Sequence, residues 1–142
     1  MQVQDYMTTR VITIQPDESA ALAARLLSWH NIGFLPVCTP GGQLQGVVTD
    51  RDIVLRCVAA EEDPAALPVR RIMSRQPASV SPEDDLRFAA EQMARSQVRR
   101  LPVLDGGKLV GTVSLGDLAK SGKCEMEVSR ALSSVSENIR RP

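Results

Sequence analysis

The chain of 142 residues is 43% hydrophobic, 24% charged and 3% aromatic, which is the composition of one folded domain or of two small ones and not of a disordered chain. Its 17 basic and 17 acidic side chains cancel at pH 7, which argues against the broad positive surface that duplex nucleic acid requires. No apolar run approaches the roughly 20 residues of a membrane span, and the start MQVQDYMTTR lacks the apolar core of a signal peptide, so we expect a soluble, cytoplasmic protein.

The first half of the chain shows strand and helix patterns bounded by prolines, glycines and helix caps. The β-branched run at residues 11–14 predicts a strand that ends before Pro16. Asp17 or Ser19 can cap the helix that follows and extends towards Asn31. The other expected elements are a strand at 34–38, a turn at 40–42, a strand at 44–48, and a helix at 51–60 opened by Thr49 or Asp50.

The second half of the chain repeats the first. With Met7 placed on Met73, residues 7–37 align with residues 73–103, and one deleted loop residue later the alignment reaches Asp52 and Asp117. The repeat therefore predicts the same elements again. They are a helix within 82–97, strands at 101–104 and 108–113, and a short helix at 116–120, followed by a trailing helix at 125–138.

Each copy has the order β-α-β-β-α and about 60 residues, which is too few to bury a good core alone. We therefore expect an α+β fold in which the two copies pack by their sheets around a pseudo-twofold axis. The expected borders are 1–62 for the first copy, 63–68 for a linker, 69–121 for the second copy and 122–142 for a C-terminal helix and tail. Residues 1–66 carry 8 acidic and 4 basic side chains and residues 67–142 carry 9 and 13, which allows a local anion site in the second half.

No catalytic or metal-binding set is visible in the sequence. The three cysteines show no Cys-x-x-Cys spacing, and His30 is the only histidine, whereas a structural zinc site needs four ligands. A Cys–His nucleophile pair would have only His30 as its base. The sequence contains no P-loop and no Gly-x-Gly-x-x-Gly motif. Asp50 and Asp52 are two residues apart at a helix start, so they point in different directions and do not form an acid–base pair. We therefore expect reduced thiols, no required cofactor, no metal and no enzymatic activity.

Two related stretches, GVVTDRD at 46–52 and GTVSLGD at 111–117, carry a hydroxyl residue followed three positions later by an aspartate. One interpretation is structural, since a hydroxyl at the N-cap and an acid at N3 form a capping box. The other is a ligand site, because a carboxylate accepts both hydroxyl protons of a vicinal diol. Ribose carries such a diol. The sequence thus makes Thr49, Asp52, Ser114 and Asp117 candidates for ribose binding, and the two interpretations are compatible.

The segments MTTRVITIQPD, HNIGFLPV and GVVTDRD, with their second copies, resemble the cystathionine-β-synthase-like (CBS) domain in order and spacing. Two such domains in tandem resemble a Bateman module, and the similarity covers about residues 5–120. The chain is similar to small bacterial proteins that consist of a CBS pair alone. The resemblance implies that both Gly-x-x-[Ser/Thr]-x-x-Asp motifs bind the ribose of adenosine compounds, in clefts between the two copies.

The resemblance also implies positions for the base and the phosphates. The expected adenine-binding residues, for which core packing is the alternative, are Thr9, Val11, Ile12, Ile32, Gly33, Phe34, Pro77, Ala78 and Val98. We expect residues 9–12 beside residues 32–34, and residues 75–78 beside residues 98–100. Arg99 and Arg100 are expected at the phosphates, as in modules of the γ type of AMP-activated protein kinase, with a solvated surface pair as the alternative.

We therefore expect a non-catalytic regulatory or sensor module that binds AMP, ADP or ATP and forms a homodimer through its helices. The helix faces Ala20-Ala24-Leu27 and Phe88-Ala89-Met93 are candidates for that contact. An effector protein that the sequence does not name would respond to the bound ligand. The alternatives are binding of S-adenosylmethionine or a dinucleotide, and a ligand-free dimeric scaffold. Single-stranded nucleic acid is disfavoured, because it needs stacking aromatics and the lone Trp29 lies in the first copy.

Overall fold

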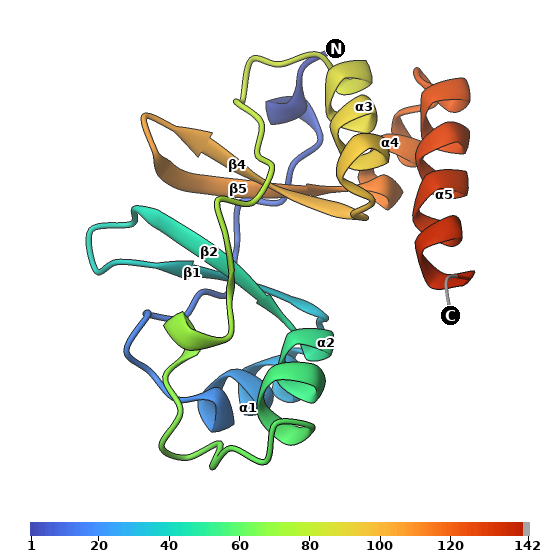
Figure 1. Cartoon of the computed structure of the whole chain (residues 1–142). Coiled ribbons are helices and arrows are strands. Elements are labelled where there is room, and N and C mark those ends of the chain that lie inside the picture. Colours follow the sequence, from blue (N-terminus) through green and yellow to red (C-terminus); the bar gives the residue numbers. More distant parts are fainter. Residues whose placement is uncertain (141–142) are drawn as a thin grey trace. The chain divides into compact units, whose positions relative to one another are not determined.

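The computed structural model describes the backbone of residues 1–140 and the side chains of residues 1–137. The chain contains both helices and strands, and Figure 1 labels the longer ones. The α-helices are α1 (Ala20–His30), α2 (Asp50–Ile53), α3 (Leu86–Ser96), α4 (Leu115–Ser121) and α5 (Glu125–Arg140). The strands are β1 (Phe34–Cys38), β2 (Leu44–Thr49), β3 (Ser74–Arg75), β4 (Arg100–Asp105) and β5 (Lys108–Ser114). Short helical turns lie at η1 (Val3–Asp5), η2 (Val54–Val58, π-helical) and η3 (Val69–Arg71).

The structure divides into two compact units whose borders cut across the two sequence copies. The first-copy unit consists of Ile12–Pro77, and the second-copy unit joins Met1–Val11 to the chain from Ala78 onwards. The initial segment of each copy therefore folds with the body of the other copy. Figure 1 shows the blue N-terminal segment beside α3, which belongs to the later half of the chain. The expected borders at 62 and 69 follow the repeat and stay a prediction, whereas the compact units are divided elsewhere.

Each unit contains one small sheet built on an antiparallel hairpin. In the first-copy unit β1 pairs with β2, and β2 pairs on its other side with β3 through Gly46↔Arg75 and Val47↔Ser74. In the second-copy unit β4 pairs with β5, and β5 is flanked by an isolated bridge between Thr8 and Thr112. The two sheets therefore have the same plan, and each is completed by a segment that the repeat assigns to the other copy.

The strand expected at residues 11–14 is reduced to one bridging residue, Ile14, and its second-copy equivalent is Val80. The amide of Ile14 donates to the Pro36 carbonyl at 3.1 Å, and the amide of Cys38 donates to the Ile14 carbonyl at 2.9 Å. Extending this parallel ladder backwards requires an N–H at residue 36, and proline has none. Pro102 limits the pairing of Val80 in the same way. The prediction of a four-residue strand was therefore wrong in extent.

The expected helices and hairpins are confirmed, and their ends have identifiable caps. Ser19 caps α1, with its hydroxyl accepting the Leu22 amide at 3.1 Å. Asn31 and Gln97 end α1 and α3 in the left-handed conformation, which commonly ends helices in proteins. The α2 helix is shorter than expected, since it passes into the π-helical turn η2 after Ile53.

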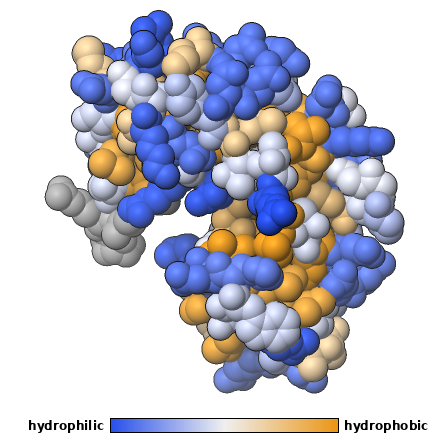
Figure 2. Space-filling view, turned by 180° about the vertical axis from the view of Figure 1, so that it is seen from behind, coloured by the Kyte–Doolittle hydropathy of each residue, from blue (hydrophilic) through white to orange (hydrophobic). Residues whose placement is uncertain are grey.

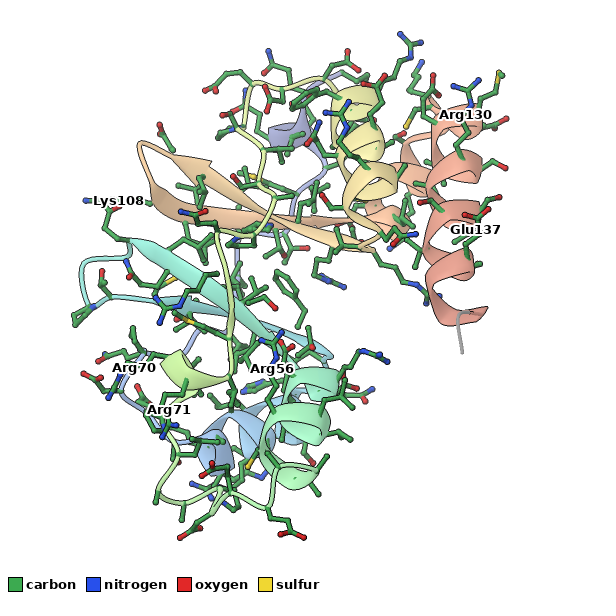
Figure 3. All side chains as sticks on the ribbon, in the orientation of Figure 1. Arg56, Arg70, Arg71, Lys108, Arg130 and Glu137 are labelled. Carbon is green, nitrogen blue, oxygen red and sulfur yellow. The ribbon has the colours of Figure 1, made fainter. Side chains whose placement is uncertain are left out.

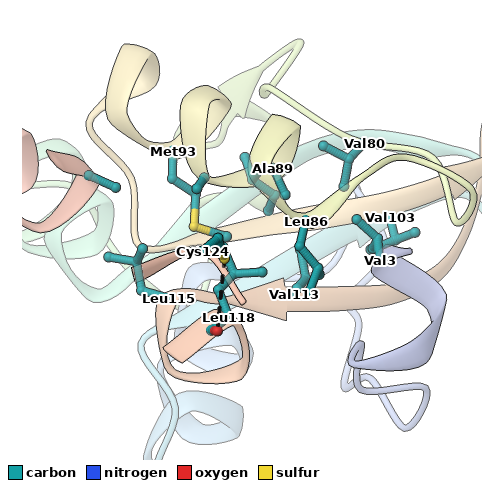
Figure 4. Close-up of a cluster of buried hydrophobic side chains, with 13 residues drawn as sticks. Val3, Val80, Leu86, Ala89, Met93, Val103, Val113, Leu115, Leu118 and Cys124 are labelled. Atoms are coloured by element: carbon teal, nitrogen blue, oxygen red, sulfur yellow. Dashed lines mark hydrogen bonds between the residues drawn. The ribbon is translucent and has the colours of Figure 1, made fainter. Parts of the chain in front are cut away.

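Each unit has its own hydrophobic core. The core of the second-copy unit packs α3, α4 and α5 against β4 and β5, and it includes the fully buried N-terminal residue Val3 (Figure 4). The core of the first-copy unit packs α1, α2 and η2 against β1 and β2, with Val69 in the place of Val3. Both valines are 0% exposed. The segment exchange is therefore part of both cores and not a surface contact.

The apolar helix faces that the sequence offered for a homodimer are mostly used inside the units. Ala20, Leu27, Ala89 and Met93 are buried in the cores, whereas Ala24 and Phe88 are exposed. The exposed large apolar side chains of the described residues are Met1, Trp29, Val54, Leu55, Val58, Phe88, Met126 and Leu132. Figure 2 shows hydrophobic side chains at the surface among hydrophilic ones. Within residues 1–140, no helix combines the length and the hydropathy needed to cross a membrane. The homodimer stays a prediction.

Candidate functional site

Both Gly-x-x-[Ser/Thr]-x-x-Asp motifs form the first turn of a helix and close a capping box. The Thr49 hydroxyl accepts the Asp52 amide at 3.2 Å, and Asp52 Oδ2 accepts the Thr49 amide at 3.0 Å. In the second copy, the Ser114 hydroxyl accepts the Asp117 amide at 3.1 Å, and Asp117 Oδ2 accepts the Ser114 amide at 2.9 Å. The structural interpretation of these motifs is therefore confirmed, and it fixes each carboxylate in a defined orientation.

The boxes occupy only part of the hydrogen-bonding capacity of each carboxylate. Each box uses one oxygen, whereas an ionised carboxylate offers about four lone-pair sites. Both aspartates are half-buried, and the side chain of Asp52 is 12% exposed. Its Oδ1 lies 3.8 Å from Arg56 Nη1, while Asp117 has no ion pair among the side chains that the structure describes. Each motif thus combines an oriented carboxylate with free lone pairs, which is what binding of a diol requires.

The first-copy unit brings part of the expected site together around Thr49 and Asp52. The β1–β2 hairpin pairs Phe34 with Thr49. Gly33 lies beside the same turn, since a Cβ built on it would be 3.7 Å from Asp50 Oδ1. Ile12 and Ile32 are half-buried and pack against the core, so the core-packing alternative holds for part of their surface. Pro77, also half-buried, is the last residue of this unit.

The second-copy unit brings another part together around Ser114 and Asp117. The β4–β5 hairpin pairs Arg100 with Ser114, and the Leu115 amide donates to the Arg99 carbonyl at 2.9 Å. Both arginine side chains are exposed, and neither makes an ion pair with the described residues. Ala78 and Val98 are half-buried against the core. Their expected contacts with phosphate and adenine stay predictions.

The border between the two compact units runs through both of the segments expected at the start of the adenine sites. Thr9 and Val11 belong to the second-copy unit, whereas Ile12 belongs to the first-copy unit. The expected position of residues 9–12 beside residues 32–34 stays a prediction. Thr8, which precedes them, exchanges two hydrogen bonds with Thr112, at 2.8 and 2.9 Å. Residues 75–78 are divided similarly, between Pro77 and Ala78. The physical reason is the segment exchange, which attaches the start of each copy to the other copy's hairpin.

Arg56 is a residue of this region that the sequence did not single out. Its Nη1 donates to the carbonyl oxygens of Ile72 at 2.8 Å and of Met73 at 3.2 Å, in addition to its contact with Asp52. Its position four residues after Asp52 is a visible signal for an ion pair along a helix. The contacts with residues 72 and 73 depend on the tertiary fold and have no sequence signal.

The cysteines are buried, and no metal cluster is found in the described residues. Cys38, Cys57 and Cys124 are all buried and unpaired by disulfides. Burial raises the pKa of the Cys38 and Cys124 thiols, which disfavours the reactive thiolate. Across the described part of the chain, no group of three or more His, Cys, Asp or Glu side chains could hold a metal ion.

Comparison with known proteins identifies the family. The profile of the CBS domain matches residues 3–58 and again residues 69–123. The chain belongs to the CBS-domain family. As a CBS pair, it is 42% identical over 138 residues to the CBS domain-containing protein YhcV of Bacillus subtilis, covering 96% of this chain and 97% of that protein. The resemblance that the sequence motifs indicated is thereby confirmed, and so is the α+β fold class.

Two solved structures of CBS pairs carry ligands and have the same fold. CBSX2 in complex with AMP matches with a TM-score of 0.75 and 29% identity, covering 85% of this chain and 95% of that one. The CBS domain pair of protein MJ0100, in complex with 5′-methylthioadenosine and S-adenosyl-L-methionine, matches with a TM-score of 0.76 and 26% identity. This match covers 86% of the present CBS pair and 95% of the other chain. All three bound molecules contain an adenosine group.

Proposed function

We propose that this CBS pair is a regulatory module that binds an adenosine-containing ligand and performs no chemistry on it. CBS-pair proteins are generally regulatory and non-catalytic. The finer proposal is that the ligand is AMP, ADP or ATP, bound between the two repeats, with Asp52 and Asp117 accepting ribose hydroxyls. Binding would act by shifting the population of conformations, and an effector protein would respond to that shift.

The observation that carries the proposal is the pair of oriented carboxylates. Each capping box fixes an aspartate through its Oδ2 and leaves lone pairs for hydroxyl donors. The two motifs sit at equivalent places in the two units, each at the end of a hairpin strand. Relatives that bind AMP, methylthioadenosine and S-adenosylmethionine support the same ligand class. Arg99 and Arg100 favour a phosphorylated member of that class, because guanidinium groups pair well with phosphate.

Isothermal titration calorimetry with AMP, ADP, ATP, adenosine, methylthioadenosine and S-adenosylmethionine tests the proposal, since it gives ligand identity and stoichiometry together. The variants Asp52→Asn and Asp117→Asn each remove one carboxylate charge while keeping an amide oxygen for the capping box. Each loses a charge-assisted hydrogen bond to ribose, worth about 1.5–3 kcal/mol, and should weaken one site by roughly 10- to 100-fold. Asp105→Asn, at the exposed end of β4, is the matched control and should bind as the parent does.

The same titrations decide between the alternatives. Arg100→Ala should weaken AMP, ADP and ATP more than it weakens adenosine, because adenosine has no phosphate. If S-adenosylmethionine binds more tightly than every nucleotide and is indifferent to Arg100, the S-adenosylmethionine alternative is correct. If no compound binds, the chain is a ligand-free scaffold and the proposed function is wrong.

A further inference from the structure

We propose that Arg56 is a positioning residue that holds the Asp52 carboxylate and couples its occupancy to residues 72–75. This inference rests on the proposed function for its ligand, and it makes the two ribose motifs of the chain unequal. Arg56 lies in the π-helical turn η2, directly after α2 (Figure 3). It is a partner of the Asp52 carboxylate.

The geometry places one guanidinium between the motif and the exchanged segment. Arg56 Nη1 lies 3.8 Å from Asp52 Oδ1, the oxygen that the capping box leaves free. The same nitrogen donates to the carbonyl oxygens of Ile72 at 2.8 Å and Met73 at 3.2 Å. A guanidinium has five N–H donors in a rigid plane, so contact with these carbonyls also fixes its position relative to Asp52. Arg56 therefore acts on the carboxylate oxygen that the capping bond does not use.

The segment that Arg56 holds is the one that completes the sheet of the first-copy unit. Ile72 and Met73 are buried, and the next two residues form β3, which pairs with β2 at Gly46 and Val47. Two residues further on, at Pro77, the chain leaves this unit. Ribose hydroxyls bound at Asp52 Oδ1 would share that oxygen with the guanidinium and draw the carboxylate charge away from it. The change would reach Ile72 and Met73 through the hydrogen bonds of Arg56.

The motif of Asp117 has no arginine at the position equivalent to Arg56. The position equivalent to Arg56 is Ser121, whose hydroxyl donates to the Leu118 carbonyl at 2.6 Å and accepts the Lys123 amide at 3.2 Å. These contacts stay within the end of α4 and do not reach Asp117 or the segment around Thr8. A change at position 56 should therefore affect only the Asp52 site and leave the Asp117 site as an internal reference.

Adenosine titration of the full chain tests the binding half of the proposal, because adenosine has no phosphate that Arg56 could attract. Arg56→Gln should lower the affinity of the Asp52 site, the one that Asp52→Asn also weakens, by about tenfold and should leave the other site unchanged. Arg56→Lys keeps the charge and should restore part of the affinity. Arg25→Gln removes an equally charged, exposed arginine from α1 and should change neither site. Parent-like binding of Arg56→Gln at both sites would overturn the proposal.

The coupling half is tested by the amide NMR shifts of Met73 and Ser74, whose N–H groups belong to the same peptide units as the two carbonyls. Without any ligand, Asp52→Asn should shift both amides in the parent and should leave them unmoved in the Arg56→Gln background. Adenosine at saturation should likewise shift them only when Arg56 is present. Equal shifts in both backgrounds would refute the coupling, whichever ligand binds. Absence of binding by the whole compound panel would instead refute the proposed function and the binding half, while the ligand-free comparison still decides the coupling.

Discussion

Gly46 and Gly111 lie at equivalent points of β2 and β5, where the exchanged segment passes too close for a side chain. A Cβ on Gly46 would lie 2.6 Å from the Ser74 carbonyl oxygen and 2.9 Å from Met73 Sδ. On Gly111 it would lie 2.8 Å from the Thr8 carbonyl oxygen and 2.9 Å from Met7 Sδ. Both carbonyls are backbone atoms of paired segments, so neither can move without loss of the pairing. Space, and not a special φ, requires glycine here.

Gly46→Ala and Gly111→Ala should each lower the free energy of unfolding by about 1–3 kcal/mol, because the added methyl overpacks the segment crossing. Equilibrium urea denaturation measures the loss. Gly116→Ala is the matched control, since its Cβ would meet only Ser114 Oγ at an ordinary 3.6 Å and would lie in α4. That variant should be as stable as the parent or slightly more stable. Equal stability of all three variants would contradict the crossing argument.

Residue patterns with a local cause were predictable from the sequence, and those with a tertiary cause were not. The hydroxyl and acid of each Gly-x-x-[Ser/Thr]-x-x-Asp motif are three residues apart, which is sufficient to predict both capping boxes. The ion pair of Asp52 with Arg56 had a helical spacing that could have been noticed. The carbonyl contacts of Arg56 join residues 16 and 17 positions apart, and no local rule predicts such a contact.

At the scale of elements, the hairpins and helices followed from turn and cap signals, but the first strand of each copy did not. Its length depends on Pro36 and Pro102, which lie in a different strand and withhold the N–H that a longer parallel ladder needs. The prolines are visible in the sequence. That they shorten the first strand of each copy can be seen only when the strand's pairing partner is known.

The trailing helix α5 is an integral part of the second-copy unit. Its Ser134 hydroxyl donates to the Ala94 carbonyl at 2.6 Å, and Gln97 Nε2 donates to the Ser134 carbonyl at 3.2 Å. Ala131 is 0% exposed and Val135 is 6% exposed. Ala131 belongs to the core cluster, and the spacing of four residues puts Val135 on the same face of α5. We therefore expect α5 to stabilise α3 and α4 and not to behave as a mobile tail.

Ala131→Asp should lower the free energy of unfolding by about 2–4 kcal/mol, because it places an unpaired carboxylate in the core. Urea denaturation measures the loss, and hydrogen exchange should show weaker protection in α5 and α3. Ser133→Asp adds the same side chain two residues away at an exposed position and should have little effect. Similar stability of the two variants would show that α5 does not depend on this face.

At the scale of the whole molecule, the initial segment of each copy folds with the other copy, and the sequence repeat did not predict this exchange. Residues 1–11 and 67–77 are related by the repeat, with Val3 matching Val69 and Met7 matching Met73. Because the two segments carry similar apolar residues, either could complete either sheet on sequence grounds. The alignment therefore predicted two copies and their elements, but it could not predict which copy each segment joins.

The exchange predicts where the damage from a point substitution will appear. Val3 and Val69 are both 0% exposed and occupy equivalent places in the two cores, so Val3→Ala and Val69→Ala should each cost about 1–3 kcal/mol. Native-state hydrogen exchange should locate the Val3→Ala loss in β4 and β5, although these strands are about 100 residues away in sequence. Val69→Ala should instead weaken β1 and β2. If each copy folded with its own first segment, Val3→Ala would weaken protection in β1 and β2, and Val69→Ala would weaken it in β4 and β5. Equal loss of protection in both sheets would mean that the two units unfold together.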